Sequence, residues 1–211
     1  MDPADFKCNW LKHEEIWLYA DNIRQLHWPE MTLPIDAEKI VESRLGLNIE
    51  PKLDLRRETD MDAFLRADLT GIVVDQDMYM DARYEKRLRF SFAHELGHYF
   101  IHDYVYTKLF NSVDDWREFI LNVSDSEYRS FEYQANEFAG RLLVPKPELI
   151  EEIQKIVTYL RTNKLVGYLA SNPDDVLARI SPMISRAFGI STDVAETRVK
   201  RENLWPPLSA L

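Results

Sequence analysis

Residues 90–102 read FSFAHELGHYFIH, and the pentapeptide HELGH within them constrains the chain more than any other stretch. On a helix, residues four apart are offset by about 40° and rise by about 6 Å, so His94 and His98 point the same way, one turn apart. Two imidazoles placed like this can bind one Zn²⁺ together. Glu95 follows His94 directly, and a carboxylate beside a metal can act as the general base of a hydrolase. The pattern therefore predicts a metal-binding helix with catalytic chemistry.

The alternative is a buried amphipathic helix that carries two histidines by chance, so a third ligand is needed. A catalytic zinc site usually takes three protein ligands and leaves one position for water. Glu132 and Asn136 lie four apart in a second stretch with helical spacing, and they share one face. We predict Glu132 as the third ligand and Asn136 as a hydrogen-bond partner of a ligand imidazole. The apolar positions of this stretch are Phe131, Ala135, Phe138, Ala139, Leu142 and Leu143.

Four other residues compete with Glu132 for the third position. His102 lies two turns past His94, about 12 Å along the helix axis, and one ion cannot be reached from both ends of that span. We therefore expect His102 to be a structural or rim histidine. The remaining rivals are Asp103, Asp125 and Glu127.

The two halves of this pattern occur together in a known family. The sequence HELGHYFIH, followed by EYQANEFAGRLLVP, resembles the ImmA/IrrE family of metallopeptidases, which is zincin-like. The family pattern is HExxH and then ExxANxFAxxLLxP. Gly140 and Val144 depart from residues common in the family, but neither is a proposed ligand. The resemblance covers Pro34 to Pro145 well and the C-terminus more weakly.

The resemblance implies a site and a substrate class. It assigns His94, His98 and Glu132 as ligands of one divalent ion, with Glu95 as catalytic base. Zinc is the expected ion, although manganese or another transition metal can occupy such ligands. It also implies protein substrates, namely helix-turn-helix repressors or antitoxin-type regulators of mobile elements and stress regulons. The sequence itself predicts Tyr99, Tyr104 or Tyr133 as the oxyanion donor.

Charge and hydropathy exclude several other classes of function. The formal net charge of −10 disfavours broad nucleic-acid binding and suits a basic protein partner. No apolar run approaches the roughly 20 residues that span a bilayer, and no secretory signal is visible. Cys8 is the single cysteine, so no internal disulfide can form, which fits the cytoplasm.

The expected fold is α+β: a zincin-like domain at residues 1–145 with N-terminal helices, a small antiparallel sheet and the metal helix. Strands are predicted within Leu47–Leu55, Ala63–Leu69 and Gly71–Asp75, and the last two form a hairpin. Gly71–Asp75 is the candidate edge strand for binding an extended peptide. The aromatic stretch between the motif helices, Asp103 to Arg129, is predicted to form a short helix or lid.

Residues 146–211 are expected to form a helical extension. One helix is predicted from Pro147, another from Asn172, a third from Ser181-Pro182 and a fourth over Thr192 to Glu202. The last two resemble a helix-turn-helix. The charges of the final helix nearly cancel, so packing is favoured over DNA reading.

These observations predict a zinc-dependent endopeptidase. The first alternative is a non-proteolytic metal-binding regulator that acts by binding protein or DNA. The second is a metal hydrolase with a non-peptide substrate, which a closed pocket would favour over a long groove.

Overall fold

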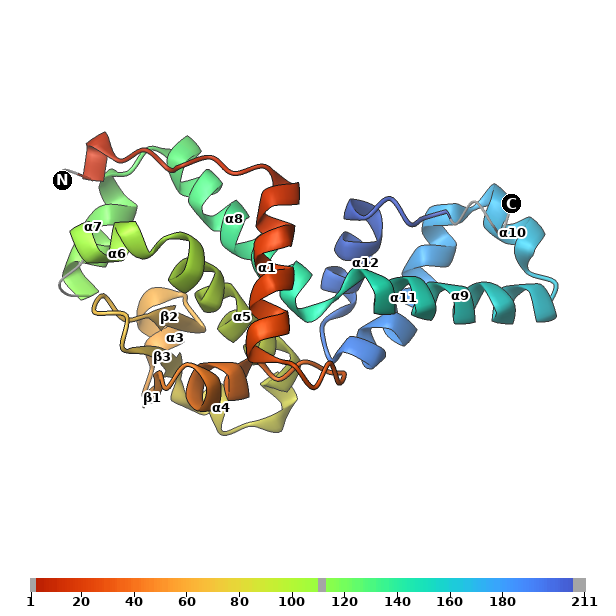
Figure 1. Cartoon of the computed structure of the whole chain (residues 1–211), viewed down its shortest axis with the longest axis horizontal. Coiled ribbons are helices and arrows are strands. Elements are labelled where there is room, and N and C mark those ends of the chain that lie inside the picture. Colours follow the sequence, from red (N-terminus) through yellow and green to blue (C-terminus); the bar gives the residue numbers. More distant parts are fainter. Residues whose placement is uncertain (1–2, 110–112, 207–211) are drawn as a thin grey trace. The chain divides into compact units, whose positions relative to one another are not determined.

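The computed structural model describes residues 3–109 and 113–206 (Figure 1). Residues 207–211, the end of the predicted C-terminal extension, lie outside this range. Contacts divide the chain into two compact units. The first comprises Met1–Glu30 and Asp36–Leu142, and the second comprises Met31–Ile35 and Leu143–Leu211.

The first unit mixes helices with one small sheet, which confirms the predicted α+β class. Its elements, in order, are η1 (Pro3–Asp5), α1 (His13–His27), α2 (Ala37–Lys39), the π-helix η2 (Ile40–Arg44), β1 (Asn48–Lys52), α3 (Leu55–Thr59), β2 (Ala63–Leu65), β3 (Gly71–Asp75), α4 (Gln76–Tyr79), η3 (Ala82–Tyr84), α5 (Glu85–Ile101), α6 (Asp103–Leu109), α7 (Val113–Asn122) and α8 (Asp125–Leu143). The helices α6 and α7 occupy the stretch predicted as a short helix or lid.

The sheet has the strand order β1-β3-β2. The predicted hairpin is confirmed, because Ala63 pairs with Val74 and Leu65 with Ile72 in antiparallel register. The prediction of a purely antiparallel sheet was wrong, since β1 runs parallel to β3. The chain reverses direction twice between these two strands, through α3 and β2, and so returns parallel.

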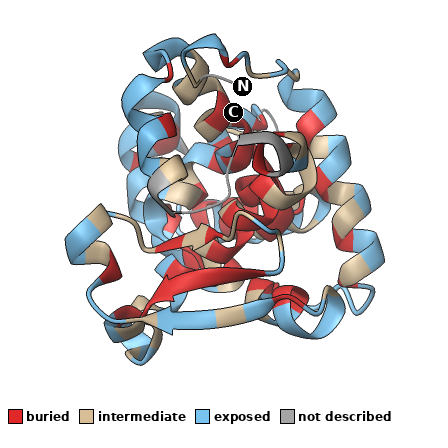
Figure 2. Cartoon of the chain, turned by 90° about the vertical axis from the view of Figure 1, so that its left-hand side faces the viewer, coloured by how far each residue is buried: buried red, intermediate tan, exposed pale blue. Residues whose placement is uncertain are grey.

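The strand β3 is central and buried along its whole length, whereas β1 is largely exposed (Figure 2). The prediction that Gly71–Asp75 forms the edge was therefore wrong. Its run of β-branched residues indicates a strand covered on both faces, which is typical of a central position. The edge strands are β1, where Pro51 lacks an N–H to donate, and β2.

The motif helices α5 and α8 approach closely at Gly97. A Cβ built on Gly97 would lie 2.9 Å from the Cα of Ala135 and 3.0 Å from its carbonyl oxygen. The hydrogen of Gly97 fits at this separation, whereas a methyl group would not. The close approach brings the imidazoles of α5 to the carboxylate of α8.

Apolar residues on both sides of this contact form the core of the first unit. Fully buried members on the two helices are Phe92, Leu96, Phe131, Phe138 and Leu142. Burying each such side chain contributes roughly 1.5–3 kcal/mol, so the helix pair is held by its apolar faces rather than by the polar site.

The N-terminal residues pack on α8. The indole of Trp17 donates to Glu137 at 2.9 Å, and the guanidinium of Arg141 donates to Asp21 at 2.9 Å. Ahead of α1, the ring of Phe6 lies edge-on to Phe119, with centroids 5.1 Å apart.

The second unit is helical. It contains α9 (Lys146–Thr162), α10 (Val166–Ser171), α11 (Pro173–Phe188) and α12 (Thr192–Arg201). The prediction of a new helix at Ser181-Pro182 was wrong, because α11 continues through Pro182. Buried Ile180 and Ile184 anchor the helix on both sides of the proline, and the Ser181 hydroxyl donates to the carbonyl of Leu177 at 2.7 Å.

The turn between α11 and α12 has the expected signature. Gly189 ends α11 in the left-handed conformation, and the Ser191 hydroxyl accepts from the amide of Val194 to cap α12. On α12, the Arg198 guanidinium is buried and pairs with Glu202 four residues on. A buried arginine that is paired within the unit cannot contact a DNA phosphate. This supports the prediction that the helix packs against its neighbours rather than reads DNA. Within the described residues, no helix has the length and apolar character to cross a bilayer.

Candidate metal centre

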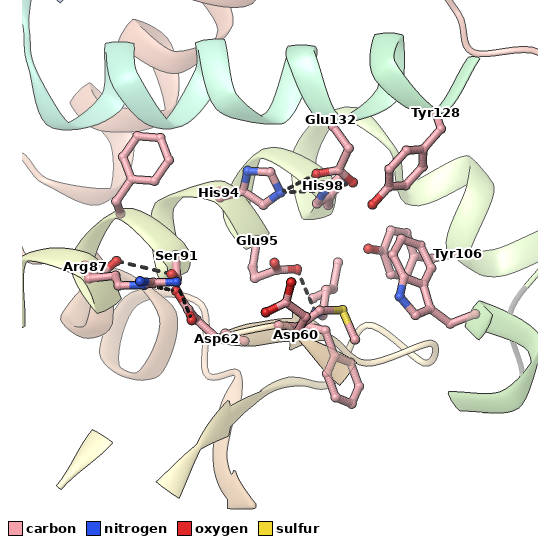
Figure 3. Close-up of a pocket in the computed structure, with 16 residues that line it drawn as sticks. Asp60, Asp62, Arg87, Ser91, His94, Glu95, His98, Tyr106, Tyr128 and Glu132 are labelled. Carbon is pink, nitrogen blue, oxygen red and sulfur yellow. Dashed lines mark hydrogen bonds and ion pairs between the residues drawn. The ribbon is translucent and has the colours of Figure 1, made fainter. Parts of the chain in front are cut away.

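The structure brings His94, His98 and Glu132 together (Figure 3). The Nε2 atoms of the two imidazoles are 3.0 Å apart, and they lie 3.3 and 3.6 Å from the Glu132 carboxylate oxygens. Ligands at about 2.0–2.2 Å around a tetrahedral Zn²⁺ are about 3.4 Å from one another. The three donor atoms therefore fit one such ion. Their types, two nitrogens and one oxygen, also suit zinc.

Asn136 holds one of these imidazoles in place, as the shared face predicts. Its Oδ1 lies 3.1 Å from the Nδ1 of His94. An amide oxygen only accepts, so Nδ1 of His94 carries a proton, and Nε2 is the nitrogen left to bind a metal.

His102 is not a ligand in this arrangement. It is completely buried, with its Nδ1 3.0 Å from the Nδ1 of His98 and its Nε2 3.3 Å from the Oε1 of Gln134. The expectation of a structural, hydrogen-bonded histidine agrees with these contacts. Two other rivals are used elsewhere: Asp103 accepts from the amide of Tyr104, and Glu127 accepts from the amide of Cys8.

Glu95 points into the same pocket from α5, and it is 6 % exposed. Its Oε2 accepts a 2.7 Å hydrogen bond from the amide of Leu65 in β2. This bond fixes the carboxylate beside the cluster and leaves Oε1 to interact with a proton. Burial raises the pKa of Glu95 to about 7.

The two imidazoles differ in their electrostatic surroundings. Burial opposes protonation of His94, but the hydrogen bond and charge of Glu132 overcome it and raise its pKa to about 9. Burial, together with the charges of His94 and His102, lowers the pKa of His98. Without a metal the pair Glu132 and His94 is thus an ion pair, and metal binding must displace that proton.

A cavity of about 250 Å³ opens in front of these side chains. Its walls include Phe64 and Leu65 of β2 and the tyrosines Tyr106 and Tyr128. Figure 3 shows the Tyr128 hydroxyl directed toward Glu132. Glu132 keeps 26 % of its side-chain surface exposed, so the centre is accessible from solution.

The tyrosines predicted as oxyanion donors do not line this cavity. Tyr104 accepts from the amide of Asn9, and Tyr133 stacks on Trp10. Tyr128 was missed by the sequence reasoning, although it lies one helical turn before Glu132 on the same face. Tyr106 comes from α6, and no sequence spacing relates it to the motifs.

Comparison with known proteins gives one result. Residues 79–200, more than half of the chain, match the peptidase family described as the IrrE N-terminal-like domain. The matched range includes both motif helices and the cluster between them. The search of curated proteins found no match.

Proposed function

Because the chain belongs to the IrrE N-terminal-like family of metallopeptidases, we propose that it is a zinc-dependent endopeptidase whose centre is His94, His98 and Glu132. The observation that carries the proposal is the spacing of these donor atoms, which fits one tetrahedral ion, beside a buried carboxylate. Manganese or another transition metal would suit the same donors less specifically.

The chemistry assigned to the chain's own residues follows from their positions. A bound divalent ion would supply Lewis-acid polarisation of the scissile carbonyl and of water. Glu95 takes the proton of the attacking water at Oε1 and delivers it to the leaving amine. The Leu65 amide keeps the Glu95 carboxylate oriented during both transfers. A pKa near 7 suits a group that accepts and then releases a proton at neutral pH.

We assign the oxyanion donor to Tyr128. Burial, together with the charges of Glu132 and Glu95, raises the pKa of its phenol to about 12, so the phenol remains a hydrogen-bond donor. Among the described residues, no hydrogen bond uses its hydroxyl, which is therefore available to a substrate oxygen. Tyr106 lines the same wall and is the second choice.

A peptide substrate would bind along β2. In the antiparallel register, the backbone carbonyl of Asp62 and the backbone amide of Arg66 bond to β3. The backbone N–H and C=O groups of Ala63 and Leu65 therefore face away from β3. The Leu65 amide already donates a hydrogen bond to Glu95, so this edge of β2 lies beside the metal centre. An extended chain can pair with the outward groups of Ala63 and with the Leu65 carbonyl. A strand edge that lines the cavity favours a peptide over a small molecule.

We further propose that the substrate is a helix-turn-helix repressor or antitoxin-type regulator, cleaved in the cytoplasm to control transcription of a mobile element or stress regulon. The support is the resemblance of the two motifs and the net charge of −10, which attracts a basic DNA-binding protein.

Substitution of Glu95→Gln tests the proposal. The amide keeps the size of the side chain but cannot accept a proton, so cleavage should fall by about 10²- to 10⁴-fold while zinc stays bound. The wild type, Glu95→Gln and the matched control Glu85→Gln, an exposed site at the start of α5, are incubated with a candidate repressor, and fragments are identified by mass spectrometry. Equal cleavage by all three proteins excludes Glu95 as the base. Regulation that survives Glu95→Gln without any cleavage supports the non-proteolytic regulator instead.

A further inference from the structure

A chain of hydrogen bonds leads from the N-terminal segment to the proposed metal centre. The amide nitrogen Nε2 of Gln134 donates to the carbonyl of Asn9 at 2.8 Å and lies 3.5 Å from the Sγ of Cys8. The other end of Gln134 meets His102, and His102 meets His98. Every member of this chain is fixed by its neighbour.

The donor and acceptor roles in this series of hydrogen bonds follow from the Asn9 carbonyl, which can only accept. It requires the NH₂ group of Gln134 on its side, so Oε1 of Gln134 faces His102. Nε2 of His102 then donates to Oε1, and Nδ1 of His102 has the lone pair. That lone pair accepts from Nδ1–H of His98. Nε2 of His98 is left unprotonated and faces the cluster, as a metal ligand must be.

The segment Phe6–Trp10, which we call the N-terminal strap, is held by contacts of its own. The amide of Cys8 donates to Glu127 at 2.8 Å, and the amide of Asn9 donates to the hydroxyl of Tyr104 at 3.1 Å. Phe6 is buried, and its ring packs against Phe131 with centroids 6.0 Å apart.

Phe131 couples the strap to the histidines by packing as well. Its ring stacks on His102, with centroids 4.2 Å apart, and lies 4.4 Å from the ring of His98. A change in the position of the strap therefore reaches His98 by two routes, one polar and one apolar.

We propose that the N-terminal strap sets the metal affinity of the centre, acting through the positioning residues Gln134 and His102 to hold His98 in its ligand tautomer and orientation. The inference rests on the metal centre proposed above. Coupling between two sites is reciprocal, so a strap that tightens metal binding must itself be tightened by the metal.

Cys8 provides a probe of how metal binding tightens the strap. It is the single cysteine of the chain, and its thiol lies against Gln134, so alkylation reports opening of the strap. The expected result is that one equivalent of zinc slows alkylation of the wild type about 3-fold or more. An unchanged rate in zinc-loaded protein overturns the inference, and this measurement needs no substitution.

Three variants test whether the strap sets the metal affinity. Their zinc dissociation constants are measured by chelator competition. His102→Phe keeps a ring against Phe131 but removes the acceptor for His98, and it should weaken zinc binding about 10- to 100-fold. His102→Gln restores an acceptor and should recover most of that loss. Tyr104→Phe, which removes the hydroxyl that meets the Asn9 amide and the Cys8 thiol, should weaken binding about 3- to 10-fold.

Lys7→Ala is the matched control. Lys7 lies in the strap and pairs with the same Glu127, but its side chain is 76 % exposed, so its removal should leave zinc affinity unchanged. Wild-type affinity in both His102→Phe and Tyr104→Phe, in protein that binds zinc, overturns the strap inference alone. Failure of the wild type itself to bind zinc would instead refute the metal centre.

Discussion

The glycine of HELGH has a measurable role in placing the metal ligands. Gly97 lies where α5 crosses α8, and a Cβ there would be 2.9 Å from the Cα of Ala135. Unbonded carbon atoms prefer about 3.5–4.0 Å, so Gly97→Ala requires the helices to separate by about 0.5–1 Å. The same separation would move Glu132 away from His94 and His98, which now lie 3.3 and 3.6 Å from it.

The magnitude follows from opposing terms. Overpacking a core contact costs about 1–3 kcal/mol, and replacing glycine by alanine within a helix returns about 1 kcal/mol. Gly97→Ala should therefore lower the free energy of unfolding by about 0–2 kcal/mol. Metal sites tolerate distance changes of only about 0.2 Å, so zinc affinity should fall by 10-fold or more.

Urea denaturation and chelator competition measure the two quantities separately. Gly167→Ala is the matched control, because Gly167 also lies in a helix but has no atom within 4 Å of its added Cβ. It should leave zinc affinity unchanged. Unaltered zinc affinity in Gly97→Ala would show that the close helix crossing does not set the ligand spacing.

Three further outcomes are expected. Glu132→Ala should abolish stoichiometric zinc binding in equilibrium titration, whereas Asp103→Ala, at a rejected ligand position, should not. Tyr128→Phe should lower kcat by about 10²-fold with KM and zinc content unchanged, and an unchanged kcat would remove it as oxyanion donor. Burial and the charge of Glu127 raise the pKa of Cys8 to about 11, so its alkylation should be about 10-fold slower than that of a free thiol at pH 8 and rise toward pH 11.

The motif helices and the residues they carry could be predicted because helical spacing is a local property. Two pairs of residues, His94 with His98 and Glu132 with Asn136, are each four residues apart. The structure brings both pairs to one cluster. Ala135 belongs to the apolar positions predicted for the second stretch, and Gly97 meets it where the two helices cross.

Other features depend on contacts between distant segments, which spacing does not report. Gly71–Asp75 lies at the centre of the sheet because it pairs in parallel with β1, which precedes it by about twenty residues, as well as with β2. Tyr106 reaches the cavity through the path of α6, and Cys8 and Asn9 reach Gln134 across more than one hundred residues. Pro182 does not interrupt α11, because the buried apolar face of the helix stabilises it on both sides of the proline.

The most direct test of the central claim is an anomalous-difference map at the zinc absorption edge from crystals of the zinc-loaded protein. The account predicts one strong peak per chain, about 2.0–2.2 Å from Nε2 of His94, Nε2 of His98 and a carboxylate oxygen of Glu132. A peak coordinated by His102 in place of Glu132, or no peak at this cluster in protein shown to contain zinc, would contradict it.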